Sequence, residues 1–172
     1  LKYCREQTEA KTVVTFACDT GNKYLSKLFN DFWMEDQGFI TREQHGDLRD
    51  LVGRPHSEHA TITVGPTDVV TTAHNRLRNA GFSQLPVMDE GRLVGVITED
   101  AIIQHVFGKP ELMNAPVAEA MESAFIKLDR TTSVNNLVAM LHVQPYAAIM
   151  DGDEFLGLIT RSDVLNYLRR QI

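Results

Sequence analysis

A four-residue motif occurs twice in this chain of 172 residues, as Gly-Val-Ile-Thr at Gly95–Thr98 and as Gly-Leu-Ile-Thr at Gly157–Thr160. At the same offset along the chain, Val87-Met88-Asp89 corresponds to Ile149-Met150-Asp151. An internal repeat predicts two copies of one supersecondary unit that stack and cover each other's apolar faces. Because clefts between such copies are natural ligand sites, the sequence favours a paired binding module.

Each copy has the hydrophobic pattern of a β-α-β-β-α unit. The first is expected to have a strand at 61–64, a helix from Val69 that ends at Gly81, strands at 84–88 and 92–97, and a helix at 99–107. The second is expected to have a strand at 123–127, a helix from Ser133, strands at 146–150 and 155–159, and a helix at 161–170. The first helices align Leu77 with Leu141, an offset larger by two than that of the strands, so the second copy is shorter by two before its middle strand.

The residues that precede the repeats show a different pattern. A β-branched and apolar run at 12–18 predicts a buried strand, and an apolar stripe predicts a helix at 23–34. A lone strand is not stable in water, and the chain begins at Leu1 rather than at Met, so we expect the rest of this domain to lie upstream. Residues 1–34 are therefore predicted to pack against another chain or to be disordered. Residues 35–59 are predicted to be a linker with one or two helical turns near 47–52.

Composition argues against several classes of protein. The net charge of −6 and the absence of a basic face disfavour a nucleic-acid partner. Cys4 and Cys18 form no disulfide framework, which favours a cytoplasmic location, and no apolar run is long enough to span a membrane. His56 and His59 have no third ligand at metal-site spacing, so no metal site is expected. No nucleophile or acid–base constellation is present, so this chain is not expected to be an enzyme by itself.

The two β-α-β-β-α units, each with Gly-x-Ile-Thr at a strand-to-helix junction, resemble the cystathionine-β-synthase (CBS) domain, which occurs in tandem pairs called Bateman modules. The resemblance implies an α/β (α+β) fold with a pseudo-twofold axis and clefts for adenosine-containing ligands. The run Cys18–Lys27, followed by Phe29–Met34, resembles the last strand, turn and helix of the catalytic domain of cystathionine β-synthase, a pyridoxal-phosphate enzyme of the cysteine-synthase type. The implied domain order is a catalytic-domain end at 1–34, a linker at 35–59, and CBS repeats at 60–115 and 116–172.

The resemblance places an adenosyl ligand at Thr160-Arg161-Ser162-Asp163. In the family, Thr/Ser-x-x-Asp opens the last helix, where the hydroxyl and free helix amides suit polar groups and the carboxylate suits ribose hydroxyls. The alternative is an ordinary capping box, in which the threonine and the acid three residues later satisfy each other's backbone amides.

The opposite wall of this site is expected from the first repeat. Gly81–Val87 matches the family's Gly-Phe-x-Gln-x-Pro-Val, which assigns Phe82 to the adenine face and Gln84 and Leu85 to its border, with Ile159 beside Thr160. The alternative for Phe82 is core packing at a helix-to-strand corner. A second, weaker site is expected at Thr98, Tyr146 and Ala147, because Ala101 stands where the family has its ribose aspartate.

The resemblance implies a regulatory pair that binds S-adenosylmethionine ahead of AMP or ATP and that acts on its own catalytic domain, in a homodimer. The parent activity would be β-replacement or cysteine synthesis with pyridoxal phosphate, and Thr20 would contact the cofactor's pyridine nitrogen. The Schiff-base lysine and phosphate loop of the family are not in this sequence. The rival hypothesis is a dimerisation module without ligand, which pairs through its helices.

Overall fold

The structure is a computed structural model that describes residues 2–14, 16, 20–24, 28–29, 31–41, 45–53, 56 and 61–170. Two compact units divide the chain, Leu1–Ile40 and Thr41–Ile172. Cys18, His59 and the turn residue Asp19 lie outside the described residues. No helix of the described ranges is long and apolar enough to cross a membrane.

The first unit contains short helical segments: α1 (Lys2–Arg5), the 3-10 turn η1 (Gly21–Tyr24) and α2 (Asp31–Asp36). The strand predicted at 12–18 is wrong for the described residues 12–14 and 16, which belong to no strand, and Phe16 is 91% exposed. The helix predicted at 23–34 is also wrong for the described residues, because 23–24 belong to η1, 28–29 form a turn and only 31–34 belong to α2. Both patterns lack an apolar partner surface within the described residues, and most of a helix's stability comes from packing rather than propensity.

The first repeat consists of α3 (Val70–Ala80), β1 (Gln84–Asp89), β2 (Arg92–Thr98) and α4 (Glu99–Val106), followed by the 3-10 turns η3 (Pro110–Asn114) and η4 (Val117–Glu119). Gly81 ends α3 in the left-handed conformation, as predicted. β1 and β2 form the predicted antiparallel hairpin. The strand predicted at 61–64 is wrong: only Val64 pairs, in an isolated parallel bridge with Val87.

The second repeat consists of β3 (Lys127–Asp129), α5 (Val134–Val143), β4 (Tyr146–Asp151), β5 (Glu154–Thr160) and α6 (Arg161–Arg170). Its sheet has the order β3-β4-β5, with β3 parallel to β4 and β4 antiparallel to β5. The strand predicted at 123–127 is shifted towards the C-terminus because pairing begins where the Ala148 amide donates to the Ile126 carbonyl. The first helices begin at the equivalent positions Val70 and Val134, and the middle strands begin at Gln84 and Tyr146, so the shorter connection lies between these elements, as predicted.

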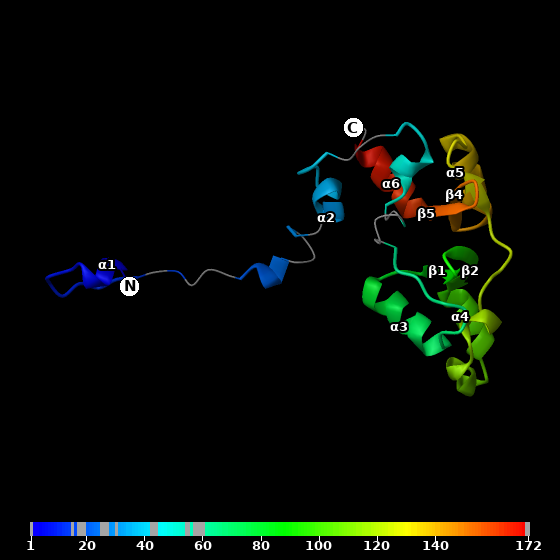
Figure 1. Ribbon diagram of the computed structural model, residues 1–172, viewed down its shortest axis with the longest axis horizontal. Coiled ribbons are helices and arrows are strands. Elements are labelled where there is room, and N and C mark those ends of the chain that lie inside the picture. Colours follow the sequence, from blue (N-terminus) through cyan, green and yellow to red (C-terminus); the bar gives the residue numbers. More distant parts are fainter. Residues whose placement is uncertain are drawn as a thin grey trace. The chain divides into compact units, whose positions relative to one another are not determined.

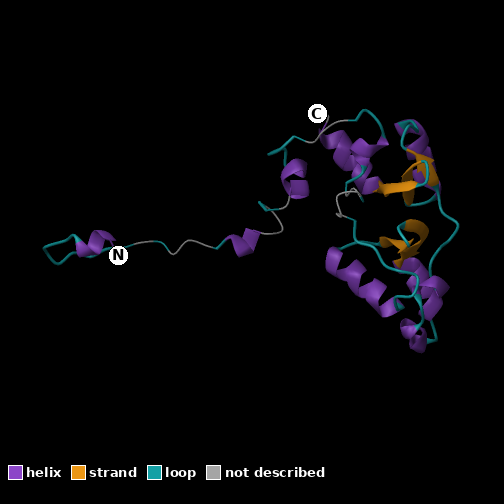
Figure 2. Ribbon diagram, viewed as in Figure 1, coloured by secondary structure: helices purple, strands orange, loops and turns teal. Residues whose placement is uncertain are grey.

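The two repeats stack through their sheets, with the helices of each repeat on the outside (Figures 1 and 2). A small apolar cluster of Leu93, Ala148 and Phe155 joins β2 to the sheet of the second repeat. This arrangement places the β2–α4 and β5–α6 junctions, where the repeated threonines lie, at the seam between the repeats.

Each repeat's core is completed by the segment that precedes the other repeat. The 3-10 turn η2 (Leu48–Leu51) and Val52 pack into the core of the second repeat, beside α6 (Figure 1). Val117 of η4 and Ala120 pack into the core of the first. Each segment is also held by a backbone hydrogen bond to the repeat that it completes: the Leu48 amide donates to the Arg130 carbonyl, and the Val117 amide donates to the Asp68 carbonyl. Leu48 and Leu51 in one segment and Val117 and Ala120 in the other are buried at the same spacing. Residues 47–52, predicted as part of a linker, are thus an integral piece of the second repeat.

Candidate ligand cleft between the repeats

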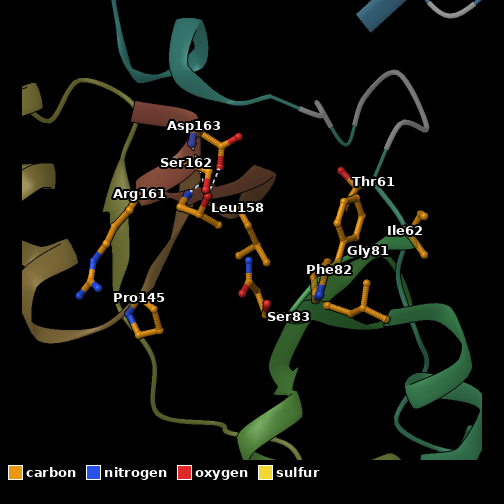
Figure 3. Close-up of a pocket in the computed structure, with 14 residues that line it drawn as sticks. Thr61, Ile62, Gly81, Phe82, Ser83, Pro145, Leu158, Arg161, Ser162 and Asp163 are labelled. Atoms are coloured by element: carbon orange, nitrogen blue, oxygen red, sulfur yellow. Dashed lines mark hydrogen bonds between the residues drawn. The ribbon is translucent and has the colours of Figure 1, made fainter. Parts of the chain in front are cut away.

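A cavity of about 430 Å³ lies between the first and second repeats. Its lining includes Gly81–Pro86 of the α3–β1 corner, Thr61 and Ile62 of the first repeat, and Pro145, Leu158 and Thr160–Asp163 of the second. Figure 3 shows Phe82, Thr61 and Ile62 on one side and the α6 residues on the other. The cavity therefore brings together two motifs that lie far apart in the sequence, one in each repeat.

Thr160 and Asp163 form a reciprocal cap at the start of α6. Oδ2 of Asp163 accepts hydrogen bonds from the Thr160 hydroxyl (2.6 Å) and amide (2.8 Å), and the Asp163 amide approaches Thr160 Oγ1 at 3.4 Å. This is the geometry of a capping box. The cap fixes the Asp163 side chain at the edge of the cavity, so the same two residues both stabilise the helix and line the cleft.

Arg161 and Asp163 are the charged residues among the described residues of the cavity wall. The Nε and Nη2 groups of Arg161 donate to the Leu141 carbonyl, at 2.9 and 2.7 Å. These bonds use a carbonyl near the end of α5 and direct the guanidinium away from Phe82 (Figure 3). The described part of the wall accordingly aims little positive charge at a bound molecule.

Five of the residues predicted for this site line the cavity: Phe82, Gln84, Leu85, Thr160 and Asp163. The sixth, Ile159, does not, because its side chain is fully buried in the core of the second repeat. Leu158 takes its place. Successive strand side chains point to opposite faces, so the residue that shares a face with Thr160 is 158 and not 159. This alternation could have corrected the assignment from the sequence.

Two of the three residues predicted for the sister site, Thr98 and Tyr146, are linked through Glu122. The hydroxyl of Thr98 accepts from the Ala101 amide (3.0 Å) and donates to Oε1 of Glu122 (3.1 Å), whose Oε2 accepts from the Tyr146 hydroxyl at 2.8 Å. Tyr146 is 1% exposed. Ala147, predicted as a wall of this site, is instead buried in the core of the second repeat.

Glu122 is the member of this network that sequence reasoning missed. It lies in the connection between the repeats, and its backbone pairs with Val96 of β2. Burial, together with the hydrogen bond to Glu122, raises the pKa of the Tyr146 phenol above its ordinary value, so this hydroxyl remains a donor. The network places a carboxylate and a phenol ring from the protein itself beside Thr98.

The other candidate residues stand apart. Thr20 is exposed just before η1, and the ring of His56 packs against Phe155. Among the described residues, no group of histidine, cysteine and acidic side chains is arranged to hold a metal ion.

The CBS-domain family matches residues 54–108 and 117–170 of the sequence. This chain belongs to the CBS-domain family. The two matches coincide with the two repeats, and the CBS pair explains both the doubled Gly-x-Ile-Thr motif and the cleft between the copies.

Curated relatives include cystathionine beta-synthase from Dictyostelium discoideum, 26% identical over 185 residues that cover 96% of this chain and 36% of that protein. The enzyme of the same name from Oryctolagus cuniculus is 24% identical over 186 residues, 98% of this chain and 34% of that protein. The chain thus spans about a third of the length of these relatives. The similarity includes the first unit, Leu1–Ile40, because a match over 98% of the chain leaves almost none of it out.

Solved structures show the same fold. A CBS domain-containing protein from Bacillus anthracis superposes with a TM-score of 0.65 at 21% identity, covering 75% of this chain and 96% of that one. Protein MJ1225 from Methanocaldococcus jannaschii superposes with a TM-score of 0.63 at 20% identity, covering 80% and 53%. These similarities are to CBS pairs, as expected from the repeat.

Proposed function

We propose that this CBS pair binds one adenosine-containing ligand in the Thr160 cleft and regulates a catalytic domain of the same protein. The observation that carries the proposal is the cavity in which Phe82 faces the Thr160–Asp163 cap across the seam between the repeats. An aromatic ring supplies a stacking surface for a purine, and a carboxylate at a helix start accepts hydrogen bonds from ribose hydroxyls.

The charge of the described part of the wall favours S-adenosylmethionine over AMP or ATP. A phosphate needs cationic donors, and the guanidinium of Arg161 is engaged by the Leu141 carbonyl. A sulfonium group brings positive charge rather than phosphate charge into the cleft and is attracted by the Asp163 carboxylate. Both repeats contribute walls, so a bound ligand would bridge them. If the CBS pair has two arrangements that bind the ligand with different affinity, the ligand shifts the equilibrium between them, and this difference is the coupling free energy.

The parent activity is part of the same proposal. The relatives that cover nearly the whole chain are named cystathionine beta-synthase, so we infer a cytoplasmic, pyridoxal-phosphate-dependent enzyme of β-replacement or cysteine synthesis, to which this pair is attached. Pyridoxal phosphate supplies the electron sink for that chemistry when bound. The Schiff-base lysine and the phosphate loop of the family are not in this sequence and Thr20 is exposed, so no step is assigned to this chain.

A calorimetric titration of the chain with S-adenosylmethionine, AMP and ATP tests the binding proposal. We expect one site, highest affinity for S-adenosylmethionine, and an increase in Tm through mass action. Asp163→Ala should abolish the titration signal. Asp153→Ala, which removes a carboxylate from the exposed β4–β5 turn, is the matched control and should bind as the parent does. No heat and no Tm change with any of the three ligands would overturn the proposal.

A second candidate is a dimerisation module, favoured by apolar side chains that remain exposed on the outer helices. Ile103 on α4 and Phe107 at its end are 57% and 85% exposed, and Leu165 and Leu168 on α6 are 67% and 51% exposed. A homodimer would bury these faces and is compatible with ligand binding. Sedimentation equilibrium of the unchanged chain and of the double variant Phe107→Ser, Leu165→Ser distinguishes assembly from ligand binding. A change from dimer to monomer mass with unchanged ligand affinity would assign these helices to assembly alone.

A further inference from the structure

The two clefts each contain one carboxylate bonded to the repeated threonine, but the two carboxylates come from different elements. In the open cleft, the Thr160 hydroxyl donates to Asp163, which lies on α6 three residues later. In the closed cleft, the Thr98 hydroxyl donates to Glu122, which lies in the segment that precedes the second repeat. Three residues after Thr98 there is an alanine, Ala101.

The position equivalent to Glu122 follows from the crossed cores. Leu48 and Leu51 are buried in one core, and Val117 and Ala120 are buried at the same spacing in the other. Five residues beyond Leu48 and Val117 are Gly53 and Glu122. Where one cleft has an acid on the helix and glycine on the preceding segment, the other has alanine on the helix and an acid on the segment.

Gly53 is in direct contact with Asp163. A Cβ atom built on Gly53 would lie 2.7 Å from Oδ1 of Asp163, closer than non-bonded atoms approach. The backbone of Gly53 is not in the left-handed region, so any residue could adopt its conformation, and the restriction is one of space. The carboxylate of Asp163 therefore occupies room that a side chain at position 53 would take.

We propose that Gly53 is a positioning residue of the ligand cleft: its missing side chain lets Asp163 stay beside Thr160, whereas Glu122 at the equivalent position fills the Thr98 cleft from within. The segment 47–53, which enters the CBS pair from the N-terminal side, is then a determinant of which cleft accepts a ligand. The binding half of this inference rests on the proposed function. The contact between Gly53 and Asp163 does not, and it can be tested without any ligand.

A double-mutant cycle in the whole chain tests the contact. Gly53→Ala is expected to lower the Tm by several degrees in the parent and to have no such effect in the Asp163→Ala background, where Oδ1 is absent. Without a clash, Gly→Ala is neutral or stabilising because it restricts the unfolded chain. Gly65→Ala is the control, since its Cβ would have no neighbour closer than 4.0 Å, and its effect should be equal in both backgrounds. An equal effect of Gly53→Ala in both backgrounds would overturn the proposal.

Titration with S-adenosylmethionine tests the consequence for binding. Gly53→Glu, which copies the sister cleft, is expected to lower the affinity at least tenfold, whereas Asn75→Glu, which adds the same charge on the exposed face of α3, leaves it unchanged. If Gly53→Glu does not fold, Gly53→Ala replaces it and is expected to bind more weakly than the parent. Parent-like affinity in the folded variant contradicts the role of Gly53 but leaves the proposed function intact. If the parent itself binds nothing, the proposed function fails, and the double-mutant cycle still decides on Gly53.

Discussion

The hydroxyl of Tyr146 donates a 2.8 Å hydrogen bond to Oε2 of Glu122, and through this carboxylate the second repeat is tied to Thr98 of the first. Tyr146 begins β4, and Thr98 ends β2. Glu122 thus links β4 to β2. The equivalent strands, β1 and β5, contribute Gln84 and Thr160 to the open cleft. Hydrogen bonds between the protein's own side chains link the repeats at Thr98, and a cavity lies between the repeats at Thr160.

Tyr146→Phe is expected to destabilise the pair by about 1–2 kcal/mol, because it removes a buried donor from a half-buried carboxylate. Urea denaturation followed by circular dichroism measures the change. Tyr167→Phe removes a hydroxyl from α6 outside this network and should change stability by less than about 0.5 kcal/mol. Equal losses in both variants would show that the Tyr146–Glu122 bond is not a special link between the repeats.

Phe82→Ala is expected to weaken S-adenosylmethionine binding between about fivefold and 150-fold, the range that stacking of one base on an aromatic ring contributes. Phe107→Ala removes a ring that is 85% exposed beyond α4 and serves as the control. Isothermal calorimetry on both variants gives the comparison. Unchanged affinity in Phe82→Ala would mean that this ring only packs at the α3–β1 corner.

Arg161→Ala is expected to separate nucleotides from sulfonium ligands. The guanidinium is held by the Leu141 carbonyl, so its loss should not reduce the affinity for S-adenosylmethionine. Its positive charge still lies on the cavity wall and attracts a phosphate, so any residual binding of AMP or ATP should fall. Competition titrations with the three ligands measure both effects. A clear loss of S-adenosylmethionine affinity would place the arginine in direct contact with that ligand. Arg161→Lys keeps the charge without the paired donors, and it should resemble the alanine variant in stability.

Several features of the pair were predictable from the sequence because they depend on local chemistry. The left-handed Gly81, the hairpin turn with positive φ at Glu90 and Gly91, and the start of α6 at Arg161 all follow from turn, cap and periodicity signals. The internal repeat also showed that the two Gly-x-Ile-Thr motifs occupy equivalent positions. These signals depend on residues close together in the sequence.

Other features were not predictable because they depend on contacts between distant segments. The polar residues around Leu48 and Leu51 in the sequence indicated a linker, yet both side chains are buried in the core of the second repeat. The whole first repeat separates these two segments along the chain. The role of Glu122 was hidden in the same way, because its partners lie on two different repeats. The bounds predicted for the strands at 61–64 and 123–127 were wrong for a related reason. Pairing with the distant strands β1 and β4 decides which residues become strand.

The carboxylate of Asp47 is expected to make stability depend on acid pH. A side-chain hydrogen bond from Arg49, with further bonds from the Arg49 amide and Arg130, lowers the pKa of Asp47 from 3.8 to about 2. Because the folded pKa is the lower one, the stabilisation is complete above about pH 4 and is lost as the pH falls towards 2.

The lowered pKa of Asp47 predicts how the variant Asp47→Asn behaves. The variant should be less stable than the parent by about 1–2 kcal/mol at neutral pH, and the difference should shrink between about pH 4 and pH 2. Urea titrations at a series of pH values measure it. Asp153→Asn in the exposed β4–β5 turn controls for the loss of a charge and should show a much smaller difference. A gap that stays constant down to pH 2 would rule out the ion pair as its source.

Leu51→Ala tests whether the segment before the first repeat is structural. Leu51 is 1% exposed in the core of the second repeat, and removing a buried leucine side chain costs about 2–5 kcal/mol. Leu28→Ala, in the first unit, removes the same atoms at 53% exposure and should cost less than about 0.5 kcal/mol. Hydrogen exchange should show the loss first in β4 and β5, because the core of the first repeat is completed by Val117 and not by Leu51. A change in Leu51→Ala as small as that of the control would mean that η2 is only a connection, and the crossed arrangement of the two cores would then contribute little to the stability of the pair.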